Sequence, residues 1–402
     1  MRHGTVTFAR GLLIAVAVLM AVGTGTPASA ARGGGGAPAA GTTLQSELYG
    51  VSCSSASACT AVGDAVTRSG VSVTVAERWN GTAWALQSMP TPSGAAATYL
   101  NGVSCASASA CTAVGQYVTG TGATVPLAER WNGTAWAVQS APSPSGATAS
   151  FLDGVSCSSA SACTAVGYSR TSAGVTVPLA ERWDGTAWTV QPTPSPSGVT
   201  ASYLFGVSCT SASACTATGF SVTSAGVSAA LAERWDGTTW TIQPTPSPSG
   251  ATASQLYGVS CASASACTAV GHYVTSTGAT VPLAERWDGT AWTIQSTPSP
   301  SGAIASYLNG VSCTSASACT AVGWYETGPG EYETLAERWD GTAWTIQSTP
   351  NPSGATASYL FGVSCTSSPT CSAVGYALNP SYTAMAEGWN GTGWAIQSIP
   401  TP

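Results

Sequence analysis

The chain has 402 residues, of which 7% are charged, and it contains no lysine. Its 11 arginines are outnumbered by 17 acidic residues, which gives a net charge of −6. A chain this acidic, without a basic patch, cannot neutralise phosphates, so the composition argues against nucleic acid as a partner.

The first thirty residues have the pattern of a signal peptide. Arg2 and Arg10 are basic, residues 12–22 are apolar, and residues 28–30 (Ala-Ser-Ala) form a small-residue cleavage site. The apolar run is too short to cross a bilayer core of ~30 Å, so we expect no membrane span. We predict cleavage after Ala30 and secretion, followed by a flexible Gly/Ala-rich linker over residues 31–43 and a repeat array over residues 44–402.

Fourteen cysteines recur in pairs of fixed spacing, each pair 52 residues after the one before. Paired cysteines without histidine partners predict disulfides rather than metal sites, and we expect no metal or cofactor. The predicted disulfides are Cys53–Cys59, Cys105–Cys111, Cys157–Cys163, Cys209–Cys215, Cys261–Cys267, Cys313–Cys319 and Cys365–Cys371.

The fifth repeat shows the predicted elements in chain order. Strands are expected over residues 256–261, 267–274, 282–287 and 291–295, and Asp288-Gly289 is a strong hairpin signal. Four short strands per unit and seven units predict an all-β, seven-bladed β-propeller with four antiparallel strands and one disulfide per blade. A β-solenoid is the alternative fold. We expect the first and last blades each to be one contiguous stretch.

Alternation along the third strand predicts how blades stack. Leu283, Glu285 and Trp287 share one face, while Ala284 and Arg286 share the other. Stacking would bring the glutamate of one blade to the arginine of its neighbour, so we predict ion pairs between blades. The glutamates are Glu77, Glu129, Glu181, Glu233, Glu285, Glu337 and Glu387, and the arginines are Arg78, Arg130, Arg182, Arg234, Arg286 and Arg338; Gly388 replaces the seventh arginine.

Two positions vary among otherwise near-identical repeats. One precedes the glycine of the first strand: Tyr49, Asn101, Asp153, Phe205, Tyr257, Asn309 and Phe361. The other follows the Ala-x-Gly of the second strand: Asp64, Gln116, Tyr168, Phe220, His272, Trp324 and Tyr376. Counting back from the disulfide brings the two positions together. Aromatic and polar side chains here predict multivalent glycan recognition on one propeller face; the alternative is a solvent-exposed edge free to drift.

Other polar and aromatic groups have plainer explanations. The sixth repeat gathers Trp324, Tyr325, Glu326, Glu331 and Glu333, which makes it the best single-site candidate, although an acidic loop is usually just solvated. Paired tryptophans such as Trp287 and Trp292 are interpreted as packing between blades. The Asn-Gly-Thr triplets at Asn80, Asn132 and Asn390 match a glycosylation sequon, but they fit the turn, where other repeats have Asp.

Catalysis has little support in the sequence. After the leader His272 is the only histidine, so a nucleophile–histidine pair could exist in one blade at most. Sialidase-like propellers need several arginines converging on a carboxylate, whereas six of the arginines here occupy one equivalent strand position and should point between blades. The ligands of a copper-oxidase propeller are missing. We therefore predict a secreted, monomeric, non-catalytic, lectin-like binding protein with glycan as ligand. The alternatives are a structural or protein-docking propeller at the cell surface, and a glycoside hydrolase using carboxylates of the sixth blade.

The repeat unit, G-V-S-C…A-C-x-A-V-G…A-E-R-W-[DN]-G-T-x-W, resembles a group of secreted bacterial propeller proteins of actinobacterial type. The resemblance covers residues 48–402. It implies a seven-bladed β-propeller and export, and it brings no assigned activity. Bacterial and fungal lectins are similar only as Trp-rich, repeat-built propellers, which is an analogy of fold.

Overall fold

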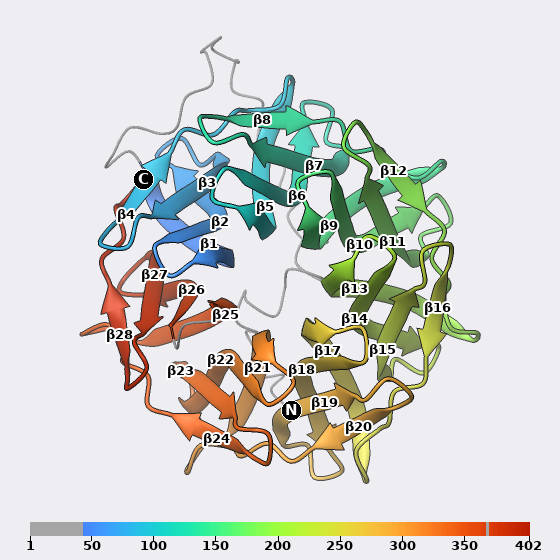
Figure 1. Cartoon of the computed structure of the whole chain (residues 1–402), viewed down its shortest axis with the longest axis vertical. Helices are drawn as coiled ribbons and strands as arrows, with labels where there is room; N and C mark the ends of the chain where they lie inside the picture. Colours follow the sequence, from blue (N-terminus) through green and yellow to red (C-terminus); the bar gives the residue numbers. More distant parts are fainter. Residues whose placement is uncertain (1–42, 367–369) are drawn as a thin grey trace, which may run out of the picture. The chain divides into compact units, whose positions relative to one another are not determined.

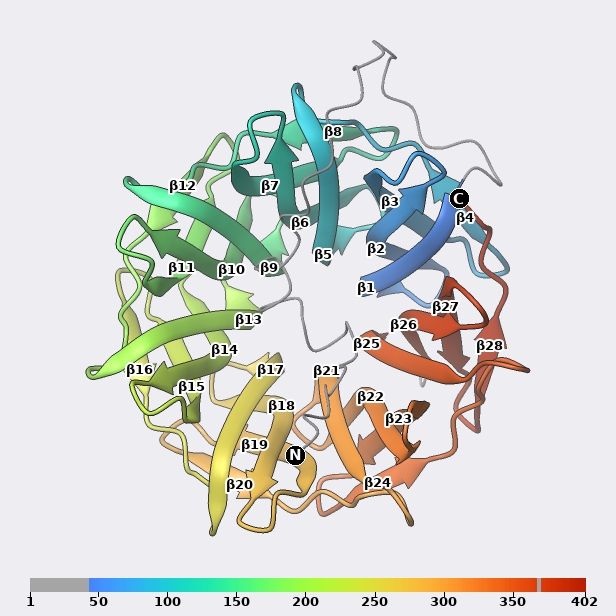
Figure 2. The same cartoon turned by 180° about the vertical axis from the view of Figure 1, so that it is seen from behind.

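The computed structural model of the chain describes residues 43–366 and 370–402. The predicted signal peptide and all but the last residue of the predicted linker lie outside the described residues. The described residues form 28 strands and no helix (Figures 1 and 2). They therefore include no helix that could cross a membrane.

The strands fall into seven repeats of four. The first strands, nearest the common centre in Figure 1, are β1 (Thr43–Ser55), β5 (Ala95–Ser107), β9 (Ala147–Ser159), β13 (Val199–Ser211), β17 (Ala251–Ser263), β21 (Ala305–Ser315) and β25 (Ala357–Cys365). The second strands are β2 (Ala58–Thr67), β6 (Ala110–Thr119), β10 (Ala162–Thr171), β14 (Ala214–Thr223), β18 (Ala266–Thr275), β22 (Ala318–Gly328) and β26 (Cys371–Leu378).

The remaining strands lie farther from the centre (Figure 1). The third strands are β3 (Ser72–Trp79), β7 (Thr124–Trp131), β11 (Thr176–Trp183), β15 (Ser228–Trp235), β19 (Thr280–Trp287), β23 (Glu331–Trp339) and β27 (Tyr382–Trp389). The fourth strands are β4 (Trp84–Gln87), β8 (Trp136–Gln139), β12 (Trp188–Gln191), β16 (Trp240–Gln243), β20 (Trp292–Gln295), β24 (Trp344–Gln347) and β28 (Trp394–Gln397).

Each repeat is an antiparallel meander, as predicted, with a first strand longer than expected. The seven predicted disulfides are present, and each joins residues directly opposite one another, such as Cys261 and Cys267. The first strand also carries a β-bulge: Leu256 pairs with Gly271 and Gly258 with Val270, which leaves Tyr257 as the extra residue. Gly271 is required here, because a Cβ atom would lie 1.9 Å from the carbonyl oxygen of Gln255.

The sheets extend beyond single repeats, which the four-strand description did not anticipate. Strands β1–β4 form one sheet, whereas β5–β16 and β17–β28 form two twelve-stranded sheets. The links between repeats are single parallel pairs, such as Thr176 with Ala201 and Thr280 with Ala305. These sheets are therefore mixed, with antiparallel repeats joined by isolated parallel bridges.

Neighbouring repeats pack a face of large side chains against a face of small ones. In the fifth repeat, Leu256, Leu283, Trp287 and Trp292 form one buried cluster together with Ala232 of the fourth repeat. The tryptophans thus pack between repeats. Within each repeat the two indole rings are tilted, with their centroids 5.7–5.9 Å apart.

The predicted ion pairs between repeats are wrong. Arg234 places its guanidinium 4.7 Å from the ring centroid of Trp287 in the next repeat, and its Nη2 donates to the carbonyl of Ala264. The carboxylate of Glu285 is fully buried and has no hydrogen-bond partner. Because Arg234 stacks on Trp287, Glu285 is left as an isolated buried acid. Burial raises the pKa of Glu285 to about 8.

One hydrogen bond recurs at every junction between repeats. The backbone N–H of the first cysteine donates to a serine hydroxyl of the preceding repeat at 2.9 Å, as from Cys261 to Ser208. The same bond, also 2.9 Å, joins Cys53 of the first repeat to Ser364 of the seventh. Each terminal repeat is a contiguous stretch, as predicted, and β1 lies beside β25 in both views (Figures 1 and 2).

Candidate functional site

The variable first-strand positions form what we call the inner ring, because they lie on the strands nearest the centre (Figure 1). All seven side chains are half-buried. Neighbouring members touch across junctions: the rings of Phe205 and Tyr257 lie 5.6 Å apart, and so do those of Tyr49 and Phe361. The inner ring is Tyr49, Asn101, Asp153, Phe205, Tyr257, Asn309 and Phe361.

The variable second-strand positions lie behind the inner ring and are buried, with 2–9% of each side chain exposed. The proposed drift at a solvent-exposed edge therefore does not describe this position. His272 does lie beside Tyr257, with ring centroids 5.7 Å apart. Its direct strand partner is Gln255: a regular ladder counted from the Cys261–Cys267 pair would place Leu256 opposite His272, and the bulge shifts the partner by one residue. The two variable positions therefore lie close together, as predicted, although they are not direct partners on the ladder.

The bulge brings in a third set of residues that the sequence analysis missed. They lie two positions before the inner ring, and most are aromatic. The sequence does carry a signal for the bulge. Gly271 pairs with Leu256 beside it, and only a glycine fits there because a Cβ atom would clash with the backbone of Gln255. The set is Glu47, Tyr99, Phe151, Tyr203, Gln255, Tyr307 and Tyr359.

Together the three sets build an aromatic belt through the third to seventh repeats. Successive rings are in contact, including Tyr203 with Phe220 at 5.0 Å and His272 with Tyr307 at 4.9 Å. The shortest contact is the stack of Tyr307 on Trp324, with centroids 4.0 Å apart. Aromatic contacts of this kind rigidify the belt and hold its half-buried inner members in fixed orientations.

A polar cluster interrupts the belt at the second and third repeats. The Asn101 amide donates to the side chain of Gln116 and to the carbonyl of Leu152, both at 2.9 Å, and lies 3.3 Å from Oδ1 of Asp153. The other carboxylate oxygen of Asp153 is buried without a partner. The cluster therefore keeps one carboxyl oxygen without a hydrogen-bond partner, buried below the surface of the ring.

Burial sets the protonation of several groups here. It raises the pKa of Asp153 to about 8, so this carboxyl holds its proton at neutral pH and can donate as well as accept. It lowers the pKa of His272 to about 4, which keeps the imidazole neutral. Burial and the nearby Glu47 raise the pKa of Asp64, and the Tyr49 hydroxyl donates to Glu47. Asp153, the one acidic member of the inner ring, and His272 behind the ring are therefore both uncharged at neutral pH.

The acidic group of the sixth repeat comes together only in part. The Tyr325 hydroxyl donates to Glu333, its direct partner across the β22–β23 ladder. Trp324 is buried between Tyr307 and Tyr359, whereas Glu331 is exposed at the tip of the hairpin.

The Asn-Gly-Thr triplets are turns, as interpreted. The Asn80 side chain accepts hydrogen bonds from the backbone of Thr82 and Ala83, and Asp288 does the same with Thr290 and Ala291. Among the described residues, no group of three histidine, cysteine or acidic side chains could hold a metal ion.

Comparisons with known proteins support the fold. No family model and no curated protein matches the sequence. A polysaccharide lyase described as an ulvan lyase aligns with a TM-score of 0.55 at 7% identity, covering 90% of this chain and 98% of its own. A six-bladed β-propeller lectin from Aleuria aurantia, described as recognising fucose, has a TM-score of 0.47 at 12% identity, covering 90% and 97%. The chain has an all-β fold of repeated four-stranded units with one disulfide per unit.

Proposed function

We propose that the protein is a secreted, non-catalytic binding protein that recognises glycan at the inner ring. The observation that carries this proposal is that fixed aromatic faces and polar side chains lie on neighbouring repeats of the inner ring. Sugar rings present apolar faces to aromatic side chains and hydroxyls to amides and carboxyls. Phe205 with Tyr257 offers an aromatic platform, and Asn101 with Asp153 offers the polar partners.

The ring geometry argues for few sites rather than one per repeat. Neighbouring aromatic rings lie 5.6 Å apart, which leaves no room for a separate sugar on each. Two aromatic pairs, Phe205–Tyr257 and Tyr49–Phe361, flank the polar cluster around the ring. We therefore expect one or two sugars bound per chain, each contacting more than one repeat.

The proposal includes a closed, seven-bladed β-propeller. It is supported by the recurrence of one junction hydrogen bond between all neighbouring repeats and between Cys53 and Ser364. It is also supported by Gly362, where an added Cβ atom would lie 2.8 Å from the Tyr49 carbonyl oxygen. Seven disulfides are in keeping with an oxidising compartment outside the cell.

A glycan array probed with residues 31–402, disulfides intact, tests the proposal. Tyr257→Ala and Phe361→Ala should weaken any hit at least tenfold, because each removes one aromatic platform. Ile294→Ala changes an exposed side chain on the outer strand β20 and should leave binding unchanged. Thermal unfolding of each variant separates lost binding from lost fold. An array without any bound glycan would contradict the proposal, and so would glycans that bind both ring variants as tightly as wild type. Either result would favour a structural or protein-docking role.

A hydrolase centred on the sixth repeat makes a different prediction. Turnover of any glycan that binds should then depend on Glu333, whose carboxylate accepts a hydrogen bond from the Tyr325 hydroxyl. The non-catalytic proposal expects bound oligosaccharides to be recovered intact after prolonged incubation. Product release that Glu333→Gln abolishes would replace it with the hydrolase.

A further inference from the structure

Six junctions between repeats are closed by an arginine that reaches into the next repeat. Arg78 is representative: its guanidinium carbon lies 4.8 Å from the ring centroid of Trp131, and its Nη2 donates to the Ala108 carbonyl at 2.7 Å. The stacked tryptophans are only 6–8% exposed. The six pairs are Arg78–Trp131, Arg130–Trp183, Arg182–Trp235, Arg234–Trp287, Arg286–Trp339 and Arg338–Trp389.

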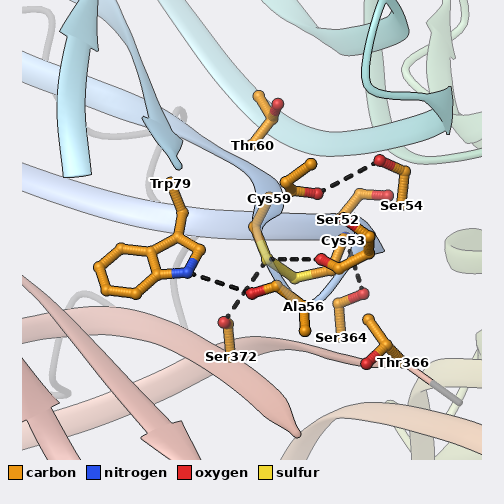
Figure 3. Close-up of a disulfide and its surroundings, with 12 residues drawn as sticks. Ser52, Cys53, Ser54, Ala56, Cys59, Thr60, Trp79, Ser364, Thr366 and Ser372 are labelled. Carbon is orange, nitrogen blue, oxygen red and sulfur yellow. Dashed lines mark hydrogen bonds between the residues drawn. A yellow bond between two sulfur atoms is a disulfide. The ribbon is translucent and has the colours of Figure 1, made fainter. Parts of the chain in front are cut away.

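The seventh junction lies between the last repeat and the first. It has the tryptophan and the alanine carbonyl that an arginine would contact, but it lacks the arginine. Gly388 stands at the arginine position, and Trp79 is the tryptophan that would be covered. Trp79 is half-buried, unlike its six equivalents. Figure 3 shows its indole beside the Cys53–Cys59 disulfide, donating to the Ala56 carbonyl at 3.2 Å. Ala56 corresponds to Ala108, the carbonyl that accepts from Arg78.

A cavity of about 300 Å³ lies at this junction, lined in part by Trp79, Ala56, Gly388 and Gln397. This volume is at the lower end of the range for ligand pockets. The Gln397 side chain has turned into the space above Gly388, and its Oε1 accepts from the Trp84 indole at 2.9 Å. In the fifth repeat the equivalent Gln295 instead donates to Thr293 on its own strand. The Gln397 amide nitrogen therefore lies over Gly388, while the Gln397 carbonyl oxygen is bonded to the Trp84 indole.

We propose that this junction cavity binds an arginine side chain presented by a partner polypeptide. The guanidinium would stack on Trp79 and donate to the Ala56 carbonyl, as the chain's own arginines do at six other junctions. A planar guanidinium fits this role better than an ammonium, because it can stack and hydrogen-bond at once. The chain's net charge of −6 favours the approach of a basic partner. This inference is independent of glycan binding at the inner ring.

Titration followed by NMR of the indole N–H groups tests the proposal on the full secreted chain. Acetyl-Gly-Arg-Gly-amide should shift the Trp79 resonance saturably, and the lysine peptide should bind at least tenfold more weakly. Free arginine amide should bind no more tightly than the peptide. A ligand that binds only as free arginine, or equal binding of the lysine peptide, would overturn the proposal.

Two variants make the test specific to the junction. Gly388→Arg supplies the missing arginine and should abolish the shift; its Cβ meets only the flexible end of Gln397, so the fold is retained. Arg286→Gly opens the equivalent site on Trp339 and should create a second saturable shift there. If Gly388→Arg still binds the arginine peptide as wild type does, or if Arg286→Gly gains no site, the proposal fails.

Discussion

Replacing Glu285 by glutamine tests whether the buried glutamates are neutral acids or members of ion pairs. The Glu285 carboxyl is fully buried without a hydrogen-bond partner, and burial raises its pKa from 4.5 to about 8. Below pH 4.5 both the folded and unfolded states hold the proton. Between pH 4.5 and 8 the unfolded state ionises first, so this group lowers the free energy of unfolding as pH rises.

The magnitude follows from the shift. A pH of 7 is about 2.5 units above the pKa of the carboxyl in the unfolded state. This difference lowers the free energy of unfolding by about 3 kcal/mol. Glutamine keeps the shape of the protonated acid and cannot ionise. Glu285→Gln should therefore be more stable than wild type by about 3 kcal/mol at pH 7, and no different at pH 4. For a unit of roughly 360 residues this raises the melting temperature by about 4 °C.

Differential scanning calorimetry at several pH values, at one scan rate, measures the effect. Glu331→Gln makes the same substitution at an exposed side chain and serves as the control. A Glu285→Gln variant that melts lower than wild type at pH 7 would refute the reasoning. It would show instead that the carboxylate is ionised and paired with a neighbouring arginine.

Further substitutions test the turn, the disulfide and the junction. Asp288→Asn should leave the melting temperature unchanged at pH 7, because asparagine makes the same turn hydrogen bonds in other repeats. Asp288→Ala should lower the melting temperature at pH 7. The difference between Asp288→Ala and wild type should vanish near pH 2, where the aspartate of the wild type takes up a proton. Replacing Cys261 and Cys267 by serine should cost about 2 kcal/mol, seen as a lower melting temperature without reductant. Gly206→Ala should lower the free energy of unfolding by about 2 kcal/mol, because its Cβ atom would lie 2.3 Å from a backbone carbonyl oxygen of the next repeat. Gly120→Ala is the control and should leave stability unchanged, because its Cβ atom would lie 3.7 Å from the nearest atom. Equal melting temperatures for the two alanine variants would contradict the close junction contact.

The fold was predictable from sequence because its determinants are local and repeated. The hairpin at Asp288-Gly289, the pairing of Cys261 with Cys267 and the alternation through Leu283 and Trp287 each depend on neighbouring residues, and each is present in the structure. Seven copies of the same pattern made the unit easy to define.

The site was predicted less well because it depends on where strands meet. The bulge at Tyr257 shifts the register by one residue, so the partner of His272 is Gln255. Strand alternation placed Arg234 between repeats, but it could not show that the guanidinium meets Trp287. The choice between an ion pair and a stacking contact is made by distances across a junction, which no single repeat encodes.

A crystal structure of the protein with its best glycan ligand would test the central claim most directly. The account predicts a sugar ring stacked on an aromatic member of the inner ring, at Tyr257 or Phe361, with a hydroxyl bonded to a neighbouring polar side chain. One or two sugars per chain are expected. Sugar bound only on the outer strands or at the sixth-repeat hairpin, with the inner ring empty, would contradict it.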